Sequence, residues 1–163
     1  MHCYGAGMSE EPPKRGADHE RFDVFLGDWR AVGRSYGIPR QADDDPRSAA
    51  EPWTSTHTGR WHTGGFFLIQ DERALTGGKQ FDTLSIMGVD PQSQRYFARS
   101  FENHGYYRHY EVTVEGRIWT LSGELERARI ELSEDGRTQT ITWEWKPNGA
   151  WLPLCDRVAS RVD

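Results

Sequence analysis

Short runs of alternating apolar and polar residues, separated by turn sequences, fill most of this chain of 163 residues. From Arg127 to Leu132, for example, charged residues alternate with Ala128, Ile130 and Leu132. A period of two is that of a β-strand with one face on a core and the other in solvent. The pattern therefore predicts an all-β protein.

Ten such runs follow one another, joined mostly by short connections rich in Gly, Pro, Asn and Asp. Such connections make hairpins, which place successive strands side by side and antiparallel. Ten strands in this order leave two exposed edges unless the sheet closes. We therefore predict an antiparallel up-and-down β-barrel, with a sandwich as the lesser alternative. The strands are expected at 29–36, 53–62, 66–73, 83–89, 95–101, 106–115, 117–122, 125–133, 138–146 and 151–161.

The ends of the domain follow from the same pattern. Residues 1–16 lack apolar periodicity and are predicted to be a disordered leader, so the single barrel domain covers residues 17–163. Residues 37–52 form a polar loop between the first two strands.

A short helix is expected before the first strand. Phe22, Phe25 and Leu26 recur at helical spacing, with Asp18 as the predicted N-cap and Gly27 as the stop. This helix would close one end of the barrel.

Charge and hydropathy limit the kinds of partner that we expect this protein to bind. The formal net charge is −5, with Arg scattered among Asp and Glu, which argues against nucleic acid. No apolar run approaches the roughly 20 residues that span a bilayer. No basic segment followed by an apolar stretch opens the sequence. We expect a cytoplasmic protein that does not bind membranes.

Metal and cofactor motifs are missing from the sequence. Cys3 and Cys155 lie at opposite ends of the chain and are expected to be free thiols, Cys155 as a small core residue. His57 and His62 are five residues apart, so one strand sends them to opposite faces. No phosphate-binding loop or nucleophile elbow is present. We expect no metal and no cofactor.

The opening of the first strand, Leu26-Gly27-Asp28-Trp29, resembles the first-strand signature of the calycins, the lipocalin-type barrels. In those families a basic residue of the last strand packs over the tryptophan, a cation–π contact. The resemblance implies that Arg157 or Arg161 lies over Trp29 and closes one end of the barrel.

More closely, the layout resembles a bacterial family of calycin-like barrels, domain of unknown function 1579. Its features occur in order over roughly residues 20–162. The resemblance implies the fold and leaves the activity open. The related nitrobindins hold haem through a histidine on a late strand, and no histidine follows His109 here, so haem is not expected. The matching residues are Leu26 to Trp29, Met87-Gly88-Val89-Asp90, Tyr96, Gly123 and Asp135-Gly136.

A mixed set of aromatic and polar residues on facing strands could converge inside the barrel. Inward arginines are costly unless they pair with a glutamate or an anionic ligand. The alternative is that Arg99 and Arg108 reach the rim or pair internally. The candidate ligand-binding residues are His57, Trp61, Arg99, Tyr106, Arg108, Tyr110 and Trp143.

Three functions stay open. The first is a small-molecule-binding barrel whose ligand is apolar or aromatic and carries an acidic group. The second is a barrel enzyme of the cyclase, isomerase or decarboxylase type, in which Tyr110 and Arg108 act with Glu111 or Glu144. The third is a structural or interaction protein, for example a homodimer that uses tryptophans such as Trp53 and Trp151.

Overall fold

In the part of the chain that the structure describes, ten long strands and one short one make up the sheet, close to the runs that the alternation predicts. The two-residue strand β4 pairs with the end of β3 and has no counterpart in the sequence pattern. The strands are β1 (Gly27–Ser35), β2 (Glu51–Trp61), β3 (Phe67–Thr76), β4 (Lys79–Gln80), β5 (Thr83–Val89), β6 (Tyr96–Glu102), β7 (Tyr107–Glu115), β8 (Ile118–Ser122), β9 (Glu126–Leu132), β10 (Thr138–Trp145) and β11 (Leu152–Arg161).

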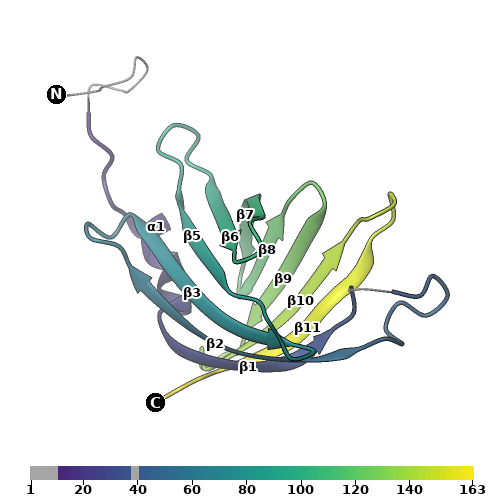
Figure 1. Ribbon diagram of the computed structural model, residues 1–163. Helices are drawn as coiled ribbons and strands as arrows, with labels where there is room; N and C mark the ends of the chain where they lie inside the picture. Colours follow the sequence, from purple (N-terminus) through teal and green to yellow (C-terminus); the bar gives the residue numbers. More distant parts are fainter. Residues whose placement is uncertain (1–10, 38–40) are drawn as a thin grey trace.

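Strand pairing closes this sheet into a barrel. In the computed structural model, which describes residues 11–37 and 41–163, each long strand pairs antiparallel with the next along the chain. β1 pairs with both β2 and β11, which joins the first strand to the last. Figure 1 shows the strands side by side in one strongly curved sheet. The predicted up-and-down barrel of ten strands is confirmed.

A short helical segment precedes the barrel, as the sequence predicts. It consists of α1 (Ala17–Glu20) and the 3₁₀ turn η1 (Arg21–Phe25). The N-cap is Gly16, so the prediction of Asp18 as the cap is wrong. Asp18 lies in the first turn, where its carboxylate accepts a hydrogen bond from the Tyr96 hydroxyl at 3.1 Å. A cap would have turned that carboxylate back onto the helix backbone.

Most of the predicted leader, residues 1–10 including Cys3, lies outside the described residues. Just before the helix, the Arg15 guanidinium donates to the Gly65 carbonyl at 2.8 Å and lies over the Trp61 ring. These contacts attach the chain to the β2–β3 connection where the helix begins.

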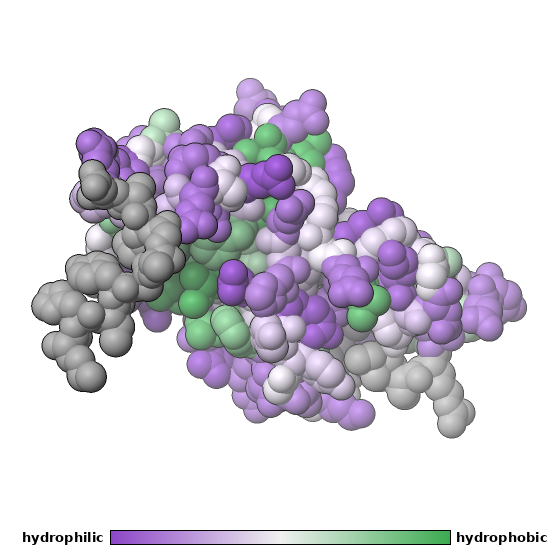
Figure 2. Space-filling view, turned by 90° about the horizontal axis from the view of Figure 1, so that it is seen from above, coloured by the Kyte–Doolittle hydropathy of each residue, from purple (hydrophilic) through white to green (hydrophobic). Residues whose placement is uncertain are grey.

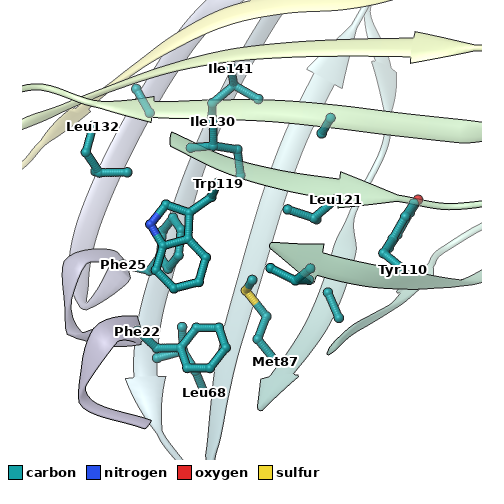
Figure 3. Close-up of a cluster of buried hydrophobic side chains, with 14 of the residues drawn as sticks. Phe22, Phe25, Leu68, Met87, Tyr110, Trp119, Leu121, Ile130, Leu132 and Ile141 are labelled. Atoms are coloured by element: carbon teal, nitrogen blue, oxygen red, sulfur yellow. The ribbon is translucent and has the colours of Figure 1, made fainter. Parts of the chain in front are cut away.

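The helical segment fills one end of the barrel with aromatic rings. Phe22 and Phe25 are buried, and their ring centroids lie 5.1 and 5.0 Å from that of Trp119. Figure 3 shows both phenylalanines projecting from the helical turns toward Trp119, with Leu68 and Met87 beside them. We call this the helix end of the barrel. Its apolar side chains exclude water.

The alternation of the strands sets the rest of the interior. Ala128, Ile130 and Leu132 are buried, as predicted from their spacing. On β7, Tyr110 and Val112 are buried, which settles which face of that strand points inward. The outer surface is largely hydrophilic in the view of Figure 2, with hydrophobic residues gathered in a few patches.

Arg161 is the arginine that covers Trp29. The two residues are register partners on β11 and β1, and the guanidinium carbon lies 4.5 Å from the ring centroid. The same guanidinium donates to the Leu26 carbonyl, while the Trp29 indole N–H donates to the Phe25 carbonyl at 3.3 Å. Arg161 therefore ties the last strand to the end of the helical segment.

The helices of the described part of the chain are all too short or too polar to cross a lipid bilayer.

Replacing Phe22 with alanine is expected to lower the free energy of unfolding by about 3–5 kcal/mol, because it leaves a cavity beneath the helix. Urea unfolding followed by circular dichroism measures this. Val24→Ala, in the same turn but on its exposed side, should change stability by less than about 0.5 kcal/mol. Equal effects of the two substitutions would show that the helix does not fill the barrel end.

Candidate functional site

Charged and polar side chains occupy the half of the barrel interior away from the helix. Tyr110 lies across the apolar cluster from Phe25 in Figure 3. A second, smaller cluster of Trp53, Ala74 and Cys155 lies apart from the large one, and Trp143 packs against both. We call this part of the inward face the polar half.

A buried ion pair joins β11 to β3 in the polar half. Arg157 Nη1 lies 2.8 Å from Glu72 Oε1, which also accepts a hydrogen bond from the Ser55 hydroxyl at 2.7 Å. The two charged side chains are only 10% and 18% exposed. Burial, the largest single effect, would raise the pKa of Glu72, but the charge of Arg157, the neighbouring His57 and the hydrogen bonds from Ser55 and Arg157 together outweigh it and hold this pKa below its ordinary value of 4.5. The pair is therefore ionised at neutral pH.

Gly33 gives Arg157 its position. It is the register partner of Arg157 on one side and of Trp53 on the other. A Cβ at Gly33 would stand 2.0 Å from the Asp156 carbonyl oxygen and 2.7 Å from the Arg157 Cα. Only glycine allows β11 to approach this closely. The guanidinium then reaches across to Trp53, with its carbon 4.4 Å from the ring centroid.

His57 adjoins this ion pair. It is the register partner of Glu72, is 7% exposed, and stacks on Trp29 with 6.0 Å between centroids and 8° between planes. Burial lowers its pKa from the ordinary 6.5, and the Arg157 charge adds to this while Glu72 opposes it. His57 is thus neutral at physiological pH.

A second ion pair involves β7 and β9. Arg108 Nε lies 2.9 Å from Glu126 Oε1, and the Tyr110 hydroxyl donates to Glu126 Oε2 at 3.0 Å. Burial and the Glu126 charge both raise the pKa of Tyr110 above 10.0, so its hydroxyl stays a donor. The Arg108 side chain is 33% exposed, and its guanidinium lies over the exposed Tyr106 ring at 5.1 Å.

Trp143 links the Tyr110 side of the polar half to the Trp53 cluster. Its ring meets that of Tyr110 edge to face, with 5.6 Å between centroids, and it packs against the cluster that contains Trp53. Together these rings give the polar half aromatic walls.

Several buried polar atoms of the interior have no hydrogen-bond partner among the described residues. Three of them are N–H donors, and the hydroxyl and the imidazole nitrogen can donate as well. Such groups cost about 1–3 kcal/mol each when they stay unpaired. The interior therefore offers more donors than it uses. The atoms are His57 Nδ1, Thr76 Oγ1, Gln139 Nε2, Trp143 Nε1 and Arg157 Nε.

Cys155 is a buried free thiol, as predicted. Burial raises its pKa from 9.0 to about 11, so it is protonated and unreactive at neutral pH. Within residues 11–37 and 41–163, no three His, Cys, Asp or Glu side chains gather where a metal ion could bind.

Four of the seven predicted site residues belong to the polar half: His57, Arg108, Tyr110 and Trp143. Tyr106 lies beside them at the rim and is 63% exposed. The structure brings this group together on the inward face and at its edge.

The other two predicted residues lie elsewhere. Trp61 is at the helix end, where its indole N–H donates to Asp23 Oδ1 at 2.9 Å. Arg99 is exposed on the outer face, because Ala98 and Ser100 take the inward positions of β6. The proposed catalytic carboxylates are also outside: Glu111 is exposed, and Glu144 pairs with Arg127 at 2.6 Å.

Glu72 and Ser55 were missed by the sequence reasoning, and Arg157 was considered only as a partner of Trp29. On β3 the signal is weak because Phe66 to Ile69 are all apolar and indicate no face. The alternating residues Leu68, Gln70 and Glu72 do lie on the inward face, but this pattern does not indicate which residue pairs with the Glu72 carboxylate.

A surface hollow of about 430 Å³ lies near α1, between the helical segment and the ends of β6 and β7. Charged residues of both signs line it, including Asp18, Arg21, Arg95 and Glu111. It has none of the unpartnered buried atoms, so we do not consider it the candidate site.

Comparison with known proteins identifies the family. Residues 14–150 match the model of a family described as "Protein of unknown function (DUF1579)". The chain belongs to this family. The predicted family resemblance is thus confirmed. No curated protein sequence matches the chain.

The solved structures that resemble this DUF1579 protein include the following two. Rv2717c from M. tuberculosis aligns with a TM-score of 0.65 at 14% identity, over 92% of this chain and 100% of that one, which shows a shared fold. The S-type phycobiliprotein lyase CPES from Guillardia theta aligns with a TM-score of 0.49 at 11% identity, over 91% and 94%.

The lowered pKa of His57 predicts a loss of stability in mild acid. In the unfolded chain His57 binds a proton near pH 6.5, whereas in the folded protein its lowered pKa keeps it neutral to a lower pH. Unfolding is therefore favoured as pH falls from about 7 to 5.5. The lowered pKa of Glu72 also reduces stability in acid, but only below about pH 4.5, the ordinary pKa of a glutamate. His57→Phe keeps a ring against Trp29. In urea titrations it should make the free energy of unfolding less dependent on pH over that interval. An unchanged slope would contradict a neutral, buried His57.

Proposed function

We propose that the polar half of the barrel binds a small apolar or aromatic molecule that carries an acidic group. The observation that supports this most is the set of buried, unpartnered N–H donors beside aromatic rings, led by Trp143 Nε1. A ligand with acceptor atoms would satisfy such donors, and the rings of Trp143, Tyr110 and Trp53 would contact its apolar body.

Arg108 is the best partner for the acidic group. Its Nε pairs with Glu126, but a guanidinium has five N–H donors, and the side chain is one-third exposed. An anion can bind the remaining donors while part of it stays hydrated, which keeps its desolvation cost low. The Tyr106 ring beneath the guanidinium would extend the aromatic surface to the rim.

Binding is better supported than catalysis. Glu111 and Glu144, the carboxylates that the sequence suggested as partners of Tyr110, lie outside the barrel. Glu126, the carboxylate that does contact Tyr110, is already paired with Arg108. Tyr110 itself donates to Glu126 and has a raised pKa, which makes it a poor base. The interaction hypothesis is weakened because Trp53, one of the tryptophans suggested for an interface, is buried inside the barrel.

Isothermal titration calorimetry with 2-naphthoate and its neutral analogue 2-naphthamide tests the proposal. The wild-type protein should bind 2-naphthoate. Arg108→Gln should weaken this binding about tenfold, the equivalent of one charge-assisted hydrogen bond, and leave 2-naphthamide unaffected.

Arg99→Gln is the matched control, because it removes the same charge from the neighbouring strand but on the outer face. It should leave both affinities unchanged. If neither naphthalene compound binds, or if the two variants weaken 2-naphthoate equally, the proposed site is wrong.

A further inference from the structure

The two ion pairs of the polar half differ in their access to water. Arg108 is 33% exposed and has donors to spare. Arg157 is 10% exposed, and one face of its guanidinium lies against the Trp53 ring. Trp143 links the two regions, because its ring contacts Tyr110 and it packs against the cluster that contains Trp53. A ligand whose acid binds Arg108 and whose body lies along Trp143 would have its other end near the more deeply buried pair.

The buried pair is already neutral as a unit. Glu72 balances the charge of Arg157, so an additional anion beside them would leave an uncompensated buried negative charge. Ser55 adds no cation, and His57 is neutral. Other charged groups of the polar half, Arg108 and Glu126, also balance each other.

Uncharged hydrogen bonding is nonetheless available at this end. Arg157 Nε and His57 Nδ1 are both buried without a partner among the described residues. Arg157 Nε can only donate, whereas a neutral imidazole nitrogen donates or accepts according to its tautomer. An amide, carbonyl or hydroxyl group fits both atoms without adding charge.

From this geometry we propose that the Glu72–Arg157–His57 group selects the far end of the ligand: it accepts a neutral hydrogen-bonding group and rejects a second acid. The natural ligand class is then a monoacid with an apolar or aromatic body and an uncharged polar group at its distal end. This inference rests on the proposed function, since it takes the acid to be held at Arg108.

Three naphthalene acids test the selection by calorimetry at pH 7.5. The reference is 2-naphthoate, and the isosteric pair is 6-carbamoyl-2-naphthoate and 2,6-naphthalenedicarboxylate, which differ in the charge of the distal group. We expect the carbamoyl compound to bind about tenfold more tightly than the reference, the gain of one buried hydrogen bond. The dicarboxylate should bind at least about tenfold more weakly than the reference.

Glu72→Gln should reverse this order. Without the carboxylate, Arg157 is an unbalanced buried cation, so the dicarboxylate should bind at least as tightly as the carbamoyl compound. Glu131→Gln, which breaks an outward pair with Arg129, should keep the wild-type order. Since the wild-type comparison needs no variant, the test survives if Glu72→Gln does not fold.

The outcomes separate the two proposals. If 2-naphthoate binds in an Arg108-dependent way but the dicarboxylate binds as well as the carbamoyl compound, the selection is wrong and the binding function stands. If no naphthoate binds, the proposed function itself fails. Unchanged selectivity in a folded Glu72→Gln protein would also overturn the role of the buried pair.

Discussion

Pairing between the first and last strands is the constraint on which the rest of the structure depends. An open sheet of ten strands would expose two edges, and the β1–β11 ladder, from Trp29 with Arg161 to Ser35 with Cys155, removes both. The same ladder places Arg157 beside Gly33, and the β1–β2 ladder continues from Gly33 to Trp53. Closure of the barrel thus also builds the polar half of its interior.

The two ends of the interior are made different by one short segment. Phe22 and Phe25 occupy the helix end, where the barrel has the apolar packing of an ordinary core. The inward ion pairs Glu72–Arg157 and Glu126–Arg108 belong to the other half, where Arg108 and Tyr106 reach solvent. Under the proposed function, this division would keep the acid of the ligand at Arg108, near water.

The strands could be predicted from the sequence because alternation is a local property. Ala128, Ile130 and Leu132 indicate their face without reference to any other strand. The site was harder to predict, because a side chain's partner depends on register around the closed sheet. Glu72 and Arg157 are 85 residues apart, and nothing near either of them in the sequence indicates the other.

Arg99 and Arg108 illustrate the same limit. Both stand in strands with aromatic neighbours, and composition gives no reason to place one inside and one outside. Their positions follow from the alternation of side chains along a strand. Ala98 and Tyr110 are buried register partners, so Arg99, next to Ala98, points outward, and Arg108, two residues from Tyr110, points inward. One fixed register pair in this hairpin would have been enough to assign both arginines.

The sequence separation of the buried ion pair also has a consequence for synthesis of the protein. During translation β3, with Glu72, leaves the ribosome well before β11, with Arg157, because chains emerge from the N-terminus. Until β11 pairs with β1, Glu72 is a carboxylate without its counter-ion, and Gly33 faces no neighbouring strand on that side. A nascent chain that lacks β11 therefore has neither a closed barrel nor the buried ion pair, so the proposed site is complete only after this last strand is in place.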